Sequence, residues 1–578
     1  MVRPGSTMEI SKVKNLLLVG FVFAVSAIAH AAPASDFRMV LLGAMKEELA
    51  RSMKELSLPG HEAPYFLSYQ LKDQTSHSIE ARYGAIFDEA TKRDAKVHVD
   101  VRVGSYDLDS SEGEESGAFS FGGEGPSYFP QLDAPIDGSA AALRNALWLA
   151  TDGKYKAALA SWLKKKSKGV YQVEENDRAS SFTKESAVRF TQPRVALPFD
   201  RARWKERAIT LSNLFRVYPG VFDSDVRVSA TRVLRIQTTS EGSEIVTEEA
   251  IYGVHIQALA RATDGELLDN SRDFFAATEV ELPPLERMQA ETKELIEELL
   301  ALQKAPVIDP YTGPAILAPE ATGVLFHEAV GHRLEGERQD DQNEGRTFKG
   351  QIGKGVLPSF LSVIDDPTKR VMGKSTLNGH YLYDDQAVAA QRAVLIDAGV
   401  LKSYLLSRKP VKGFARSNGH GRAQSNRAPI ARMANLFVES THKLSAEKLR
   451  QMLIEEAKRA NKPYALIIRD ITGGNTNTST YGYQAFKGVP RMVYRVDVNT
   501  GKEELVRGVE IVGTPLMSIN KIVATGDEIG IFNGYCGAES GYVPVSTVAP
   551  ASLISEIELQ RTAKVNERSP MLPSPWTK

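Results

Sequence analysis

The chain has 578 residues, enough for more than one domain with a sizeable hydrophobic core. Its 71 Lys and Arg residues nearly balance its 72 Asp and Glu residues, so composition gives no general reason to expect nucleic acid or an anionic membrane as a partner. The single cysteine, Cys536, excludes an intrachain disulfide.

Residues 1–31 have the three-part layout of a secretory signal peptide. Lys12 and Lys14 precede an apolar run at 16–29, and Ala-His-Ala at 29–31 supplies the cleavage site. The run is shorter than the about 20 residues of a transmembrane helix. We therefore expect an exported protein, periplasmic or secreted, with no membrane span after signal removal. An uncleaved anchor is the alternative.

Residues 32–300 predict an N-terminal α+β domain with insertions. Helical periodicity is found at 37–56, 140–150, 155–166 and 286–303, and strand patterns at 65–71, 78–83, 95–103, 225–231 and 233–238. The strict alternation at 95–103 indicates a half-buried strand of an antiparallel sheet. It places His98 on the polar face, where we expect a surface histidine and not a metal ligand.

Residues 301–578 predict a C-terminal domain made of strands and turns. Two hairpins are expected, one turning at Gly399 and one at Gly501. A helix at 445–458 begins at the N-cap Ser445. We expect a twisted antiparallel sheet or partly closed barrel that carries a metal-binding helix.

That helix holds His327, Glu328 and His332, with Pro319 predicting its start and Gly336 its end. Zinc peptidases space such histidines at i and i+4, whereas the spacing here is i and i+5. Five residues of α-helix would turn the two rings roughly 140° apart. A π-turn would realign them, and Gly331 inside that turn would ease the distortion.

A catalytic zinc takes three protein ligands and leaves one position for water. His327 and His332 supply two of them. Cys536, in a glycine-rich segment at 532–541, is the preferred third ligand, and Glu335 is its rival. An unliganded buried cysteine is the other interpretation. Glu328 is the candidate general base, taking a proton from zinc-bound water and returning it to the leaving amine.

These motifs resemble the TldD/PmbA family of metallopeptidases. The resemblance is carried by the histidine motif and by the segments 311–317, 419–425, 429–435 and 534–537. It implies one zinc per chain, held by the two histidines and Cys536, with Glu328 as base. It also implies an unstructured peptide substrate held as an added strand. The active site would be enclosed in a dimer, with an identical or a related subunit.

The chain departs from the family in two places. The usual Asp-Asp-Glu-Gly is Asp-Asp-Gln-Ala at 384–387, near the expected substrate path. The family is mostly cytoplasmic, whereas this chain carries a signal segment and a long first half.

Arg422, Arg432 and Asn435 are candidate substrate-binding residues, because an arginine fork suits a peptide backbone or carboxylate. The alternative is that they stabilise the barrel through buried hydrogen bonds. The predicted function is zinc-dependent hydrolysis of extended or unfolded peptides. The alternatives are a peptide-binding or assembly subunit whose metal is structural or absent, and a hydrolase of a non-peptide amide.

Overall fold

The computed structural model describes residues 36–111, 132–169, 179–340, 346–476, 486–513, 515–562 and 572. The signal segment predicted at 1–31 lies outside these ranges, so export stays a prediction. None of the described helices is long and apolar enough to cross a lipid bilayer.

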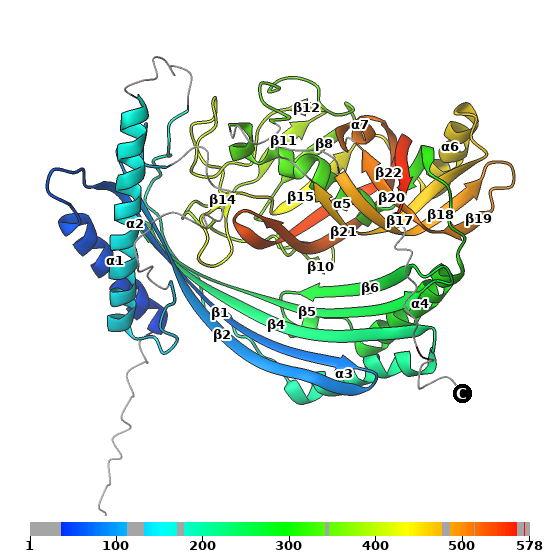
Figure 1. Ribbon diagram of the computed structural model, residues 1–578, viewed down its shortest axis with the longest axis horizontal. Helices are drawn as coiled ribbons and strands as arrows, with labels where there is room; N and C mark the ends of the chain where they lie inside the picture. Colours follow the sequence, from blue (N-terminus) through cyan, green and yellow to red (C-terminus); the bar gives the residue numbers. More distant parts are fainter. Residues whose placement is uncertain are drawn as a thin grey trace, which may run out of the picture.

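A long curved sheet organises the first half of the chain (Figure 1). Within the described residues it has six strands in the order β2-β1-β4-β5-β3, and β6 also pairs with β5. The strands are β1 (Pro64–Arg82), β2 (Ala85–Val103), β3 (Arg189–Thr191), β4 (Val221–Thr239), β5 (Glu244–Arg261) and β6 (Leu267–Ala276). Strand β1 is continuous where two short strands were predicted. Its polar middle at 72–77 pairs with β2 on one side and β4 on the other, so sheet pairing overrides the local pattern.

Four helices pack on this sheet: α1 (Phe37–Glu55), α2 (Ala140–Gly169), α3 (Arg201–Asn213) and α4 (Leu285–Lys304). The first two contact each other and the strands at one end, whereas α3 packs on β1, β2 and β4 and α4 packs on β5 and β6. Helix α2 is one continuous helix where two were predicted, because Leu143, Leu147, Tyr155 and Leu159 lie in one hydrophobic core on both sides of Gly153.

The second half is built on a large mixed sheet of twelve strands among the described residues. Strands β7, β17, β18, β20 and β22 form a closed ring, because β22 pairs with both β20 and β7. This confirms the α+β class and the partly closed barrel. Three pairings in this sheet are parallel, so it is not purely antiparallel.

The strands of this half are β7 (Tyr311–Leu317), β8 (Leu361–Asp365), β9 (Val371–Met372), β10 (Ser375–Thr376), β11 (Ala393–Asp397), β12 (Val400–Leu401), β13 (Gly421–Arg422), β14 (Ile430–Ala431), β15 (Asn435–Ser440), β16 (Lys443–Leu444), β17 (Tyr464–Thr476), β18 (Phe486–Asp497), β19 (Glu503–Val506), β20 (Val509–Gly513), β21 (Ile522–Ala538) and β22 (Gly541–Arg561). The helices are α5 (Pro319–Phe326), α6 (Ala446–Arg459) and α7 (Pro515–Asn520).

Several local predictions are confirmed in this half. Gly399 and Gly501 have positive φ at the two predicted hairpin turns. The Ser445 side chain accepts a hydrogen bond from the Lys448 N–H and caps α6. Helix α4 ends at Lys304 and β7 begins at Tyr311. The division of the chain into domains at residue 300 stays a prediction.

The C-terminal half lies along the concave side of the curved sheet (Figure 1), and a buried ion cluster joins the two. The Asp385 carboxylate accepts from Gln70 at 3.0 Å and lies 2.8 Å from Lys72 Nζ and 2.9 Å from Arg235 Nε. Gln386 accepts from the Arg408 N–H at 2.7 Å. The segment 384–387 therefore fastens the C-terminal half to the first sheet.

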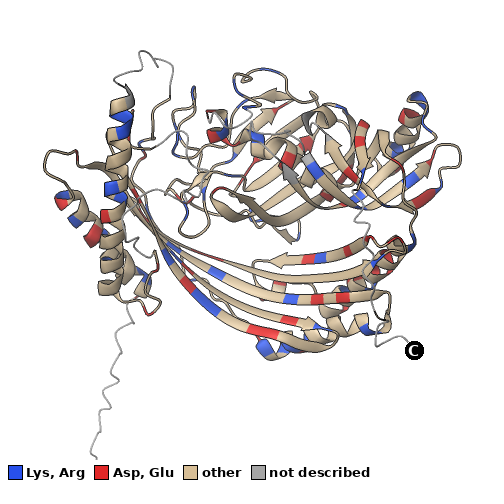
Figure 2. Ribbon diagram, in the orientation of Figure 1, with Lys and Arg blue, Asp and Glu red and all other residues tan. Residues whose placement is uncertain are grey.

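Figure 2 shows charges of both signs interspersed along the strands of the curved sheet.

This packing corrects the prediction for His98, which is buried and not on the surface. His98 pairs with Gln70 of β1, and Gln70 contacts the Asp385 loop. The polar face of the sheet is therefore covered by the other half of the protein. Burial lowers the pKa of His98 to about 4.

The burial of His98 predicts a stability loss in mild acid. Below about pH 6.5 the unfolded chain protonates this histidine, whereas the folded chain resists protonation down to about pH 4. Stability contributed by the neutral ring is therefore lost as pH falls through this window. Between pH 7 and pH 5 we expect the wild type to lose about 2 kcal/mol more free energy of unfolding than His98→Gln. Urea unfolding at the two pH values measures this difference, and parallel losses would contradict the assignment.

Candidate metal centre

The two histidines lie on a helix whose geometry changes between them. Helix α5 begins at the predicted Pro319, is buried from Ala321 onward, and packs against β17, β21 and β22. A π-helical turn follows at His327–Gly331, and a 3-10 turn at His332–Leu334. The predicted π-turn is therefore confirmed. The predicted end at Gly336 is wrong by two residues, because Glu335 is extended and Gly336 begins another 3-10 turn.

Two contacts hold the π-turn in place. Any Cβ added to Gly331 would overlap Met433 Sδ, so the glycine is needed for close packing as well as for the turn itself. Arg333 is buried and donates to the carbonyl oxygens of Glu328 at 2.9 Å and Ala329 at 3.2 Å. It satisfies backbone groups at the point where the helical hydrogen-bond pattern shifts. Sequence reasoning did not find Arg333.

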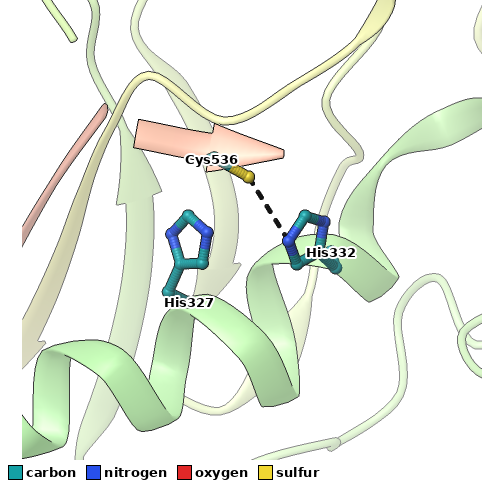
Figure 3. Close-up of side chains that lie close together, drawn as sticks. All are labelled: His327, His332 and Cys536. Carbon is teal, nitrogen blue, oxygen red and sulfur yellow. Dashed lines mark hydrogen bonds between the residues drawn. The ribbon is translucent and has the colours of Figure 1, made fainter. Parts of the chain in front are cut away.

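The π-turn brings both histidines to Cys536 of β21 (Figure 3). The ring centroids of His327 and His332 are 5.1 Å apart, and one ligand atom from each of the three residues lies within 4.8 Å of the others. His332 Nε2 is 3.4 Å from Cys536 Sγ. Ligands of a tetrahedral zinc would place this nitrogen and sulfur about 3.6 Å apart. The three predicted ligands therefore converge on one point, although 204 residues separate His332 from Cys536.

Glu335 lies behind His332 and not beside the ligand atoms. Its Oε1 is 3.2 Å from His332 Nδ1, the ring nitrogen that does not face Cys536. Its Oε2 accepts from Arg338 Nε at 2.7 Å. A carboxylate on the far nitrogen of a metal-binding histidine fixes its tautomer and orientation. The geometry favours Cys536 over Glu335 as the third ligand.

The charges in the site favour an anionic sulfur. Burial raises the pKa of the Cys536 thiol, but the His332 and His327 rings lower it by more, so the pKa lies well below its usual range. Burial lowers the pKa of His332, but Cys536 and Glu335 raise it to about 10. Burial raises the pKa of Glu335, but His332 and Arg338 lower it to about 2. The protein groups alone thus stabilise a thiolate, the form of cysteine that binds metals.

This donor set fits a metal ion. His327, His332, Cys536 and Glu328 are 5%, 6%, 4% and 9% exposed, so all four side chains are buried. His327 Nδ1 is buried and has no hydrogen-bond partner in the described part of the chain. Buried polar atoms normally have a partner, and coordination through Nδ1 would supply one. Two imidazoles and a thiolate suit zinc.

The three candidate substrate-binding residues are all buried and engaged internally. Arg422 donates to the carbonyl oxygens of Met433 and Pro544, and Arg432 to those of Cys536 and Gly541. Asn435 accepts from the Gly379 N–H at 3.0 Å and donates to the Lys369 carbonyl at 2.8 Å. These contacts match the structural alternative, and a role in peptide binding stays a prediction.

Comparison with known sequences points to one family. A model of the PmbA/TldA metallopeptidase C-terminal domain matches residues 310–561. A metalloprotease of Archaeoglobus fulgidus is 30% identical over 326 residues, 56% of this chain and 69% of that protein. A metalloprotease TldD homolog of Haemophilus influenzae is 30% identical over 275 residues, 47% of this chain and 52% of that protein. A zinc metalloprotease TldD homolog of Saccharolobus solfataricus is 26% identical over 332 residues, 56% of this chain and 67% of that protein.

Solved structures extend the likeness to the first half. TldE from Thermococcus kodakarensis aligns with a TM-score of 0.58 at 12% identity, covering 89% of this chain and all of that one. A protein of Thermotoga maritima described as a modulator of a DNA gyrase aligns with a TM-score of 0.60 at 15% identity, covering 89% and 99%. At this identity the likeness shows the fold, which includes the curved sheet.

The fit of Gly331 against Met433 predicts that Gly331→Ala destabilises the protein. Overpacking of this kind costs about 1–3 kcal/mol. Gly323→Ala in α5 is the matched control, because its Cβ would meet Phe532 and Thr547 at an ordinary 3.5 Å. Alanine in a helix is favoured over glycine by about 1 kcal/mol, so this control should be neutral or stabilising. Urea unfolding compares the two variants, and equal effects would contradict the role given to Gly331.

Proposed function

Because the chain belongs to the TldD/PmbA metallopeptidase family, we propose that it is a zinc-dependent peptidase that hydrolyses extended or unfolded peptides. The observation that carries the proposal is the convergence of His327, His332 and Cys536 in one buried site. A zinc ion held by these ligands would lower the pKa of a coordinated water and polarise the scissile carbonyl.

In this proposal Glu328 is the general base. It follows His327 in the π-helical turn, and its side chain is buried. Its carboxylate would accept the proton of the attacking water and deliver it to the leaving amine. The backbone of Glu328 is fixed by Arg333, which supports a defined position for the base.

The burial of the site supports an extended substrate. A folded domain would not bring a peptide bond to groups that are less than a tenth exposed, whereas a single extended chain is narrow enough. Strand β21 offers a place for such a chain. One side of residues 529–535 pairs with β22. On the other side of β21, the described residues show pairing only with β16, and only at Thr525 and Gly526. An open edge beside Cys536 suits binding of the peptide as an added strand.

We also propose export of the chain and assembly with an identical or related subunit. Export is supported by the signal-like layout of residues 1–31. Assembly is supported by two large aromatic side chains near Cys536 on the β21–β22 hairpin, because Tyr535 is 54% and Tyr542 67% exposed.

The proposed ligand set predicts near one zinc per chain in the wild type and a clear loss in Cys536→Ser. Serine keeps the shape of the side chain but does not supply a thiolate. Because Cys536 is the single cysteine, the change affects no other thiol. Elemental analysis of the purified proteins measures zinc per chain. Full retention of zinc by the variant would remove Cys536 from the ligand set.

The proposed role of Glu328 predicts that Glu328→Gln keeps its zinc and loses peptide hydrolysis. Loss of a general base reduces the rate by about 10²–10⁴-fold. The same change at Glu439, on an exposed position of β15, is the control and should leave the rate unchanged. Single-turnover cleavage of unstructured peptides measures the rate. Equal rates in wild type and Glu328→Gln would contradict the proposed role of Glu328. A zinc-loaded wild type that binds peptides without turnover would favour a peptide-binding subunit.

A further inference from the structure

Arg432 lies behind the metal centre and is fully buried. Its guanidinium donates to the Cys536 carbonyl at 2.7 Å, to Ser540 Oγ at 2.8 Å and to the Gly541 carbonyl at 3.0 Å. Cys536 lies in β21, Ser540 in the connection and Gly541 at the start of β22, so all three acceptors belong to the β21–β22 hairpin that presents the Cys536 thiol. One side chain therefore fixes the backbone on which this ligand stands.

The same guanidinium reaches the second ligand through Glu335. Arg432 Nε is 3.6 Å from Glu335 Oε1, the oxygen that lies 3.2 Å from His332 Nδ1. The other carboxylate oxygen is held by Arg338, which also pairs with Glu539 of the β21–β22 connection. Glu335 is thus placed between two arginines and the imidazole that it orients.

Burial makes this arrangement sensitive to the loss of one partner. Arg432 and Glu335 are 0% and 1% exposed, so removal of Glu335 takes away the carboxylate that the buried Arg432 faces, and removal of Arg432 leaves Glu335 with one cation fewer. The fork of an arginine also fits several acceptors at once, which the single ammonium of lysine does not reproduce. The contacts therefore require an arginine at this position.

We propose that Arg432 is a positioning residue of the metal centre, holding the Cys536 backbone and the Glu335–His332 pair at the distance needed for joint coordination. The inference rests on the metal site of the proposed function but not on its substrate. It assigns Arg432 to the metal centre, where sequence reasoning had considered peptide binding or general support of the barrel.

The test compares Arg432→Lys and Arg432→Met with the same changes at Arg408. Arg408 is an equally buried arginine, 1% exposed, that donates to the Thr183 carbonyl and to Glu241 at the contact between the two halves. The Arg408 variants therefore show how much stability is lost when any buried arginine is removed, and what exceeds this loss in the Arg432 variants is an effect on the metal site. Zinc affinity is measured by competition with a chelating indicator. The absorption of the Co²⁺-loaded proteins reports the bond between the thiolate and the metal.

We expect the Arg432 variants to bind zinc about 10- to 100-fold more weakly, the range for lost partners of metal ligands. The thiolate-to-cobalt absorption should shift or weaken, and lysine should be less damaging than methionine. The Arg408 variants should keep the affinity and spectrum of the wild type. Equal losses in both sets, or an unchanged affinity and spectrum in the Arg432 variants, would overturn the inference.

A second variant covers failure of the Arg432 variants to fold. Glu335→Gln keeps the shape of the side chain and removes the charge that Arg432 faces, and it should weaken zinc binding in the same direction. An unchanged affinity in Glu335→Gln would overturn the inference. A wild type that binds zinc but cleaves no peptide would overturn the proposed peptidase alone, and a wild type without metal affinity would overturn both.

Discussion

The five-residue separation of His327 and His332 is the constraint on which the site depends. On a regular α-helix these rings would point roughly 140° apart and would share no ion. The π-helical turn removes this conflict and brings their ring centroids to 5.1 Å. The turn requires more than regular helical hydrogen bonds. The Arg333 side chain satisfies its shifted carbonyls, and the missing Cβ of Gly331 leaves space for Met433.

The third candidate ligand, Cys536, lies on β21 and not on the helix. Strand β21 pairs with β22, and β22 closes the barrel ring against β7 and β20. Helix α5 packs against both β21 and β22. The distance between thiol and imidazoles is therefore set by the closure of the barrel, so the site forms only when this half of the chain has folded.

Sequence patterns predicted what is local and missed what depends on distant contacts. The hairpin turns at Gly399 and Gly501, the cap of α6 and the π-turn follow from residues close together in the chain. The burial of His98 does not, because the alternation of a strand reports two faces but not what covers the polar one. Arg333 was missed although its acceptors are nearby carbonyls, because nothing in the sequence separates it from a solvent-exposed helical arginine. Arg432 was singled out for peptide binding, but its contact with the Cys536 carbonyl depends on tertiary structure.

The ligand atoms already converge among the protein groups alone, which bears on how the metal is bound. Burying Glu335 and the Cys536 thiolate is costly, and the cost is offset during folding by Arg338, Arg432 and the charged form of His332. When the donor side chains are already ordered, less of the metal-binding free energy is lost to ordering them, so the affinity is higher. Because the unfolded chain lacks this arrangement, metal affinity is coupled to the stability of the barrel. A substitution that loosens the barrel far from the ligands should therefore weaken the metal site before it unfolds the protein.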